Sequence, residues 1–356
     1  MAAFRPGVEV CRALYTTAVR PLLDAHHPGL PHAAARIGPG SDVLGYDTPR
    51  STDHDWGPQL TLLLSAPDLA AHGDAIRALL AERLPTAVLG HSTHFLPPSG
   101  RVRVMTPVTT GPVAHRVEVT TLAGWATAHF ADCSDVAGTS FWLRTPAQRL
   151  AEAVGGAVFH DTTGELTALR QRLAWYPGPV WRYVLAAEWT HIAQEEAFPG
   201  RALEAGDETG SLIVAARLAR HVMRLALLLR RRYPPYSKWL GTAFARLGFP
   251  AGLAGIAAPD TRLDVLCTAY ETLGRWQNDL GLCEPVPPTR RLYHDRPYQV
   301  IDATRFAAAL WPAGVALGAV DQVADSTDVL MSPPLCAAVA SAVRGQAGQH
   351  PPGGLP

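Results

Sequence analysis

Cysteine is scarce and unpatterned in this chain of 356 residues. The cysteines are odd in number and no two of them lie close together, so the sequence predicts neither a disulfide framework nor a zinc knuckle. This usage is typical of a reducing compartment, and we therefore expect a cytoplasmic protein. The cysteines are Cys11, Cys133, Cys267, Cys283 and Cys336.

Long hydrophobic runs and an excess of charge of one sign are also missing. No apolar stretch reaches the roughly 18 residues of a membrane-spanning helix, and the first residues lack the continuous apolar core of a signal peptide. Lys plus Arg number 31 and Asp plus Glu also number 31, so the formal net charge is zero. We expect a protein without membrane contact, and the charge balance argues against extended nucleic acid as a partner.

Several common catalytic motifs are absent. The sequence has no His-Glu-x-x-His, no Gly-x-Ser-x-Gly and no Walker-type Gly-Lys-Ser/Thr. His191 precedes Glu195 and Glu196 but lacks the second histidine of a zinc protease. These absences argue against a zinc protease, a serine hydrolase with a nucleophile elbow and a P-loop NTPase.

The length of the chain suggests two domains, and its patterns change character near Thr145. Helical and strand-like patterns alternate before this point, whereas helical patterns dominate after it. We predict an α+β fold, with a mixed β-sheet domain at residues 1–144, an all-helical domain at residues 145–345 and a disordered tail at residues 346–356. Helices are expected at residues 8–25 (broken at Pro21), 65–84, 146–156, 164–175, 179–197, 211–232, 236–247, 261–280, 303–311 and 333–344, and strands at residues 60–65, around 102–104 and at 113–121.

One stretch of the first domain points to a reaction. Gly40 and Ser41 form a turn that can bring backbone N–H groups and a hydroxyl close to a phosphate. Asp53 and Asp55 follow, and we expect them on a strand that continues into residues 60–65, where two carboxylates at i and i+2 share one face. Carboxylates held this close suit Mg²⁺, although acidic residues are also common in turns. Such a pair of features is typical of phosphoryl or nucleotidyl transfer.

A site with two metal ions needs a third carboxylate, for which Glu118 is the best candidate. It lies within a strand-like segment, on the polar face opposite Val117 and Val119. The alternative is an exposed edge residue paired with Arg116 or Arg103. His54 is expected to be structural, and Asp42 and Asp47 to cap turns.

Basic residues of the helical half are candidates for holding the phosphates. Arg220 shares a predicted helical face with Arg217, His221 and Arg224, which is either a solvated face or a wall of the substrate cleft. Lys238 lies in an aromatic, proline-containing segment and either reaches a β- or γ-phosphate or lies along the surface.

The stretch from Ile37 to Asp55 resembles the signature of the nucleotidyltransferase superfamily, which includes DNA polymerase β-like and aminoglycoside nucleotidyltransferases. That signature is an apolar residue, Gly-Gly or Gly-Ser, about ten residues, and then acidic-x-acidic. Pro39 and the segment at residues 56–58 depart from it. More narrowly, the chain is similar to the DUF4037 family. The segments that carry this similarity are residues 38–48, 51–58, 200–201, 206–207 and 233–241.

The resemblance implies a nucleotidyltransferase-like sheet followed by a helical domain, but it names no substrate. We expect a Mg²⁺-dependent nucleotidyltransferase, with two ions, that transfers NMP, in the first instance AMP from ATP, to a small-molecule or protein acceptor bound against residues 195–241. One alternative is a nucleotide-binding regulatory protein without turnover. The other is ATP-dependent activation of a carboxylate in a biosynthetic pathway.

Overall fold

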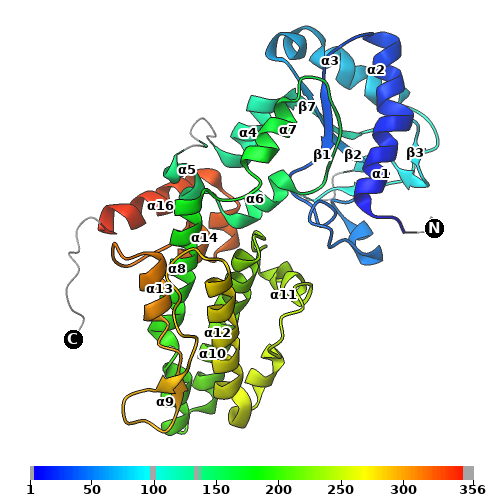
Figure 1. Cartoon of the computed structure of the whole chain (residues 1–356). Coiled ribbons are helices and arrows are strands. Elements are labelled where there is room, and N and C mark those ends of the chain that lie inside the picture. Colours follow the sequence, from blue (N-terminus) through cyan, green and yellow to red (C-terminus); the bar gives the residue numbers. More distant parts are fainter. Residues whose placement is uncertain (1–3, 97–101, 132–135, 137, 348–356) are drawn as a thin grey trace. The chain divides into compact units, whose positions relative to one another are not determined.

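The computed structural model of the chain describes residues 4–96, 102–131, 136 and 138–347 (Figure 1). The chain forms two compact units: residues 1–136 and 149–174 make up unit 1, and residues 137–148 and 175–356 make up unit 2. Unit 1 thus takes in residues 149–174, which lie beyond the boundary that we predict between residues 144 and 145. Most of the predicted tail, residues 348–356, lies outside the described residues.

A four-stranded sheet in the order β7-β2-β1-β8 forms the centre of unit 1. β2 pairs with β7 in parallel, whereas β1 pairs with both β2 and β8 in antiparallel fashion, so the sheet is mixed. The predicted α+β class with a mixed sheet is confirmed. Its strands are β1 (Ala33–Arg36), β2 (Gln59–Leu64), β7 (Arg116–Thr121) and β8 (Ala157–Asp161).

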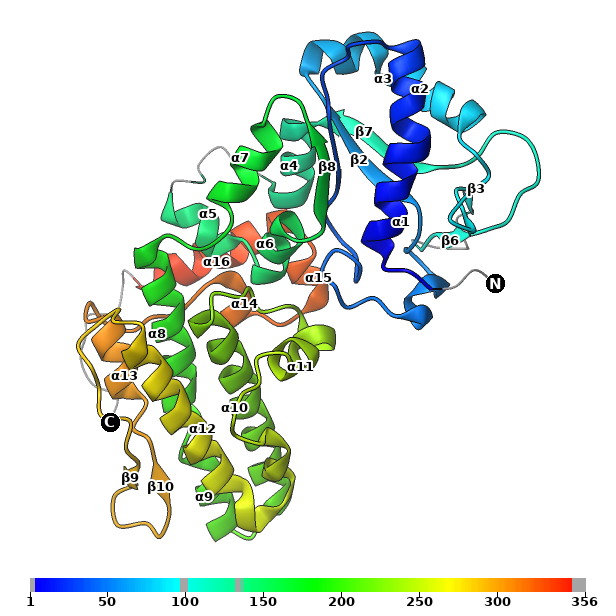
Figure 2. The ribbon, with the colours of Figure 1, turned by 45° about the vertical axis from the view of Figure 1, so that its right-hand side comes forward.

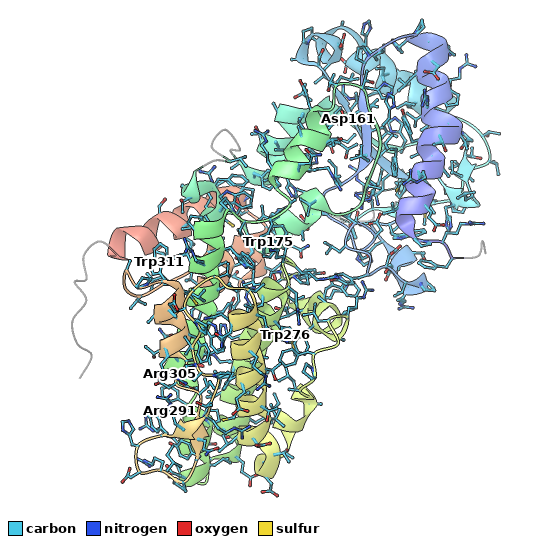
Figure 3. All side chains as sticks on the ribbon, viewed as in Figure 1. Asp161, Trp175, Trp276, Arg291, Arg305 and Trp311 are labelled. Atoms are coloured by element: carbon cyan, nitrogen blue, oxygen red, sulfur yellow. The ribbon has the colours of Figure 1, made fainter. Side chains whose placement is uncertain are left out.

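Two of these strands were not predicted. β1 begins with three alanines, which favour helices, but its position between β2 and β8 satisfies its backbone on both sides. β8 lies in the half that the sequence analysis assigns to helices. Asp161 ends this strand and caps the next helix, because its carboxylate accepts hydrogen bonds from the Gly164 N–H at 3.0 Å and the Thr167 N–H at 2.8 Å (Figure 3).

One face of the sheet carries the main core of unit 1. Leu60, Leu62 and Leu64 alternate along β2 and pack with Val117 and Val119 of β7. Helical residues complete this core. They come from the end of α1 (Gly7–Leu14), from η1 (Tyr15–Val19), from α2 (Arg20–His26) and from α3 (Ala66–Arg83).

We predict that the first helical stretch breaks at Pro21. In the structure it continues through Pro21 to His26. Proline has no N–H to offer to the preceding turn. The chain accommodates it with the π-helical turn at Tyr15–Val19, which replaces the i→i−4 pattern just before the proline.

Helices also cover the other face of the sheet (Figures 1 and 2). Leu63 of β2 lines a small cavity there together with Leu122, the first residue of α4, and Leu166 of α7. The other elements described for unit 1 are η2 (Pro49–Asp53), β3 (Ala87–Val88), β4 (His91–Ser92), β5 (Phe95–Leu96), β6 (Val104–Met105), α4 (Leu122–Phe130), α6 (Ala147–Val154, begun in unit 2) and α7 (Glu165–Arg172).

Unit 2 is built around α8 (Gly178–Glu195), which packs against α10 and α13. Trp189 of α8 stacks on Phe306 with ring centroids 4.6 Å apart and donates a hydrogen bond to the Gln277 side chain at 2.6 Å. The other helices are α5 (Thr139–Arg144), α9 (Phe198–Glu204), α10 (Glu208–Leu229), α11 (Ser237–Ala245), η3 (Leu253–Ala257), α12 (Pro259–Asp279), α13 (Thr304–Leu310), α14 (Val320–Val323), α15 (Thr327–Leu330) and α16 (Pro333–Ala347).

We predict an all-helical second domain, but unit 2 also contains a short hairpin. β9 (Arg291–Leu292) pairs with β10 (Gln299–Val300). Arg291 and Arg305, labelled in Figure 3, both form ion pairs with Asp302, at 3.2 and 3.4 Å. No helix of the described residues is long and apolar enough to span a membrane.

Candidate functional site

Four of the five candidate residues of unit 1 lie in one connection at one end of the sheet, which we call the loop end. β1 ends here at Arg36, while β2, β7 and β8 begin here at Gln59, Arg116 and Ala157. The connection from β1 to β2 therefore starts and finishes at this end (Figure 1). This connection carries Gly40, Ser41, Asp53 and Asp55.

The Gly40–Ser41 turn is built on a buried ion pair, which we call the Arg36 clamp. Both oxygens of the Asp42 carboxylate accept from the Arg36 guanidinium, at 2.7 and 2.8 Å. The same guanidinium donates to the carbonyl oxygens of Ile37 at 3.1 Å and Pro39 at 2.8 Å. The prediction that Asp42 caps the turn is therefore wrong, because its carboxylate binds the Arg36 guanidinium. The sequence signal for the clamp was an arginine directly before the Ile-Gly-Pro-Gly-Ser run.

Asp53 and Asp55 do not lie on a strand, which corrects the prediction. Asp53 ends the 3-10 helix η2, and Asp55 follows with a φ of 46°, in the left-handed region. β2 begins only at Gln59. Pro49 starts the 3-10 turn at a position that suits its fixed φ, and the resulting loop holds both side chains about half exposed, at 49% and 43%.

The two carboxylates have different neighbours. Asp53 lies 2.8 Å from the ring of His54, which is itself exposed and so is not a packed core histidine. Asp55 accepts a hydrogen bond from Arg116 at 2.8 Å, and its backbone N–H donates to the Arg103 carbonyl at 2.8 Å. Arg116 is therefore the partner of Asp55, a role that the sequence analysis missed.

Glu118 lies further along β7, where it is in register with Thr61 of β2. This places its backbone about 7 Å beyond that of Arg116, which is in register with Gln59 at the loop end. Glu118 is exposed, yet the protein around its carboxyl raises the pKa through desolvation. A raised pKa suits a carboxylate that accepts a proton in a reaction.

The carboxylates of Asp53 and Asp55 are of the chemical kind that binds Mg²⁺ together with a phosphate ligand. Asp53 and Asp55 supply hard oxygen donors, and Mg²⁺ commonly binds one or two carboxylates together with substrate phosphates. Across the part of the chain that the structure describes, no three His, Cys, Asp or Glu side chains gather into a metal-binding group. Both predicted ions, and Glu118 as a ligand, therefore stay a proposal.

Buried polar groups of unit 1 lie next to the Gly40–Ser41 turn. The Gly38 N–H donates to the Glu152 carbonyl at 3.0 Å, and the carboxylate of Glu152 lies 3.4 Å from the Arg149 guanidinium. His129 is hydrogen-bonded to the Arg149 carbonyl at 2.9 Å and stacks on Trp125 with centroids 4.9 Å apart. Burial lowers the pKa of His129 to about 4, so this ring is neutral at pH 7.

The other two candidates, Lys238 and Arg220, belong to unit 2. Lys238 is exposed in the first turn of α11, and its ammonium lies 5.0 Å from the centre of the Trp239 ring. Arg220 is partly buried on α10, where desolvation lowers its pKa. Their predicted contacts with phosphates stay predictions.

The basic face of α10 is only partly exposed to solvent. Two of its residues, His221 and Arg224, are buried and pair with Glu188. Glu188 of α8 is fully buried and lies 2.8 Å from His221 and 2.7 Å from Arg224. Arg224 also pairs with Asp321 at 3.1 Å, and Gln322 donates to Glu188 at 2.9 Å. Burial by itself would raise the pKa of Glu188, but Arg224 and His221 outweigh it and lower the pKa. We call these residues the Glu188 network.

Part of the chain matches a known protein family. Residues 142–240 match the family described as "Domain of unknown function (DUF4037)". The predicted resemblance to this family is confirmed over this segment. The match runs from α5 into α11 and does not include the Gly40–Ser41 turn or the two aspartates.

Other comparisons add little about chemistry. No curated protein matches the chain. Among solved structures, it is similar to a nucleotidyltransferase-like protein from Exiguobacterium sibiricum 255-15, at 12% sequence identity and a TM-score of 0.30, over 77% of this chain and 79% of that one. A similarity of this extent decides neither fold nor function, which therefore rest on the geometry of this chain.

Proposed function

We propose that the chain is a Mg²⁺-dependent nucleotidyltransferase that transfers NMP, in the first instance AMP from ATP, to a small-molecule or protein acceptor. One observation carries the proposal. The Gly40–Ser41 turn and the carboxylates of Asp53 and Asp55 belong to a single connection that leaves and re-enters the sheet at the loop end. Phosphate-binding N–H groups beside hard oxygen ligands are what a nucleoside triphosphate with its metal requires.

In this proposal the turn binds the triphosphate, and the two aspartates hold the metal that accompanies it. Mg²⁺, when bound, neutralises charge on the phosphates and on the leaving pyrophosphate. The acceptor oxygen forms a bond to the α-phosphorus while the bond from that phosphorus to the bridging oxygen breaks. Pyrophosphate leaves with the electron pair of the broken bond, and the acceptor proton passes to Glu118.

The contact between Asp55 and Arg116 opposes this chemistry, because the guanidinium holds one oxygen of the carboxylate that the metal would use. The ion pair is partly exposed, with side-chain exposures of 43% for Asp55 and 25% for Arg116. Pairs of this kind contribute only about 0–1 kcal/mol, so a metal–triphosphate complex can displace the arginine.

The first experiment is titration of the protein with ATP in Mg²⁺ and again in EDTA. We expect Mg²⁺-dependent binding by the wild type and its loss in the double variant Asp53→Asn/Asp55→Asn. Asp74→Asn is the matched control, since Asp74 is a fully exposed acid of unit 1 that pairs with a surface arginine at 2.7 Å. Wild-type affinity in the double variant, or no binding by the wild type, would overturn the proposal.

A second function deserves a separate test because Arg116 already neutralises Asp55 and Glu118 stands apart from the two aspartates. These observations favour a nucleotide-binding protein without turnover. Release of pyrophosphate from ATP, measured across hydroxyl, amine and carboxyl acceptors, separates the two functions. Binding with no pyrophosphate released by any acceptor would favour the non-catalytic protein.

A further inference from the structure

The Gly40–Ser41 turn owes its shape to Arg36. The guanidinium binds the carbonyl oxygens of Ile37 and Pro39 from the inside, at 3.1 and 2.8 Å, while the carboxylate of Asp42 holds it in place. Arg36 is only 5% exposed and Asp42 only 3%, so the clamp is part of the core and not a surface contact. Two carbonyls that point inward determine where the neighbouring N–H groups point.

In a trans peptide the carbonyl and the following N–H point in opposite directions, and the described chain has no cis peptide bonds. The N–H groups of Gly38 and Gly40 therefore point away from the guanidinium. That of Gly38 donates to the Glu152 carbonyl at 3.0 Å. Those of Gly40 and Ser41 have no hydrogen-bond partner among the described residues.

Gly40 has no room for a side chain, because a Cβ atom at this position would collide with the Arg36 guanidinium and the Asp42 carboxylate. The backbone of the turn thus passes directly over the clamp. A change of shape or position in the guanidinium is transmitted to the Gly40 N–H without an intervening side chain.

We propose that Arg36 is a positioning residue that turns the Gly40 N–H group toward a triphosphate. The inference rests on the proposed function and adds how its phosphate-binding turn is held ready. Arg36 never contacts the ligand in this mechanism. It acts through the two carbonyls, so its loss weakens binding of the phosphates, whatever the base of the nucleotide.

The test compares Arg36→Lys with a matched control, and inorganic triphosphate in Mg²⁺ is the probe. Lysine keeps the charge but cannot bind the carboxylate and both carbonyls in one plane. Arg262→Lys is the control, because Arg262 is 1% exposed and donates to the carbonyls of Ile256 and Ala257 in unit 2. We expect Arg36→Lys to weaken triphosphate binding at least about tenfold, a change of about 1.4 kcal/mol, and Arg262→Lys to leave the affinity unchanged.

A second measurement uses the wild type and so does not depend on the folding of a variant. Nuclear magnetic resonance with labels on proline carbonyls and glycine nitrogens observes only glycines that follow proline, among them Gly40. We expect its amide resonance to shift as triphosphate saturates the protein. A melting curve shows whether each variant is folded.

The outcomes separate the inference from the function on which it rests. Triphosphate binding by the wild type, with equal affinity in folded Arg36→Lys or with an unmoved Gly40 resonance, overturns the positioning role alone. Absence of triphosphate and ATP binding by the wild type overturns the proposed function, and the positioning role with it.

Discussion

Asp53 and Asp55 lie about half exposed in the loop before β2, whereas Glu188 is completely buried in α8. The two aspartates each have one cationic or imidazole neighbour, while Glu188 is surrounded by Arg224, His221 and Gln322. A buried carboxylate must be matched by its partners, because no water remains to solvate it.

The difference shows where this chain can accommodate a ligand. In the Glu188 network both oxygens of the Glu188 carboxylate have hydrogen-bond partners, so they support the packing of α8, α10 and α14. At the loop end, water can reach the carboxylates of Asp53 and Asp55, and a metal ion can replace it. Acidic residues that look alike in the sequence thus divide into a structural group and a candidate reactive group.

The largest effect on stability is expected when the charge of Glu188 is removed. We expect Glu188→Gln to lower the free energy of unfolding by about 3–5 kcal/mol, because Arg224 is then buried with less compensation. Urea unfolding measures the effect. Glu195→Gln on the same helix is the control, since Glu195 pairs with the exposed Arg217 and should contribute under about 1 kcal/mol. A loss below about 1 kcal/mol in Glu188→Gln would contradict the structural role.

A smaller effect on the free energy of unfolding is expected from His129, which is buried in unit 1. Its pKa in the folded protein is about 4, lowered from 6.5 by burial. His129 therefore binds a proton at a higher pH in the unfolded chain than in the folded protein. The free energy of unfolding is unaffected above about pH 6.5 and falls as the pH drops to about 4. At about 1.4 kcal/mol per pKa unit, the loss is about 3 kcal/mol.

Unfolding in urea at pH 7.5 and pH 4.5 checks this prediction. His129→Gln should reduce the difference in unfolding free energy between the two pH values, because glutamine does not titrate. His26→Gln, at an exposed histidine of α2, is the control and should behave as the wild type. The same pH dependence in His129→Gln and wild type would show that His129 does not contribute.

The smallest effect on stability is expected at the candidate site itself. Asp53→Asn should change the free energy of unfolding by no more than about 0.5 kcal/mol, since the side chain is exposed and its ion pair with the neighbouring His54 lies at the surface. The same unfolding experiment measures it. A loss above about 1.5 kcal/mol would mean that Asp53 supports the fold, and the contrast with Glu188 would disappear.

Regular elements with a strong period could be predicted from the sequence. The alternation in residues 113–121 identified the strand that the structure has as β7, and the predicted helix at residues 179–197 corresponds to α8. Strands without such a pattern were missed. β1 is a run of alanines whose strand conformation depends on its two neighbours in the sheet, which the local sequence does not contain.

The sequence singles out the residues of the candidate site, which stay a prediction, but it does not predict their geometry. The spacing of Gly40, Ser41, Asp53 and Asp55 singled out the connection that the structure brings to the loop end. The expected strand before Gln59 was wrong, because Pro49 and the turn at Asp55 hold the chain in a loop.

The α+β class and most of the helices could be predicted from the sequence alone, because they depend on local periodicity and on residue chemistry. Which charges pair, and which of these pairs are buried, follows from the tertiary structure. Arg36 with Asp42 and Glu188 with Arg224 are buried pairs, whereas Arg116 with Asp55 is a partly exposed one. Pairing of this kind depends on the register of strands and on the packing of helices, since each charge takes the partner that the fold brings within reach.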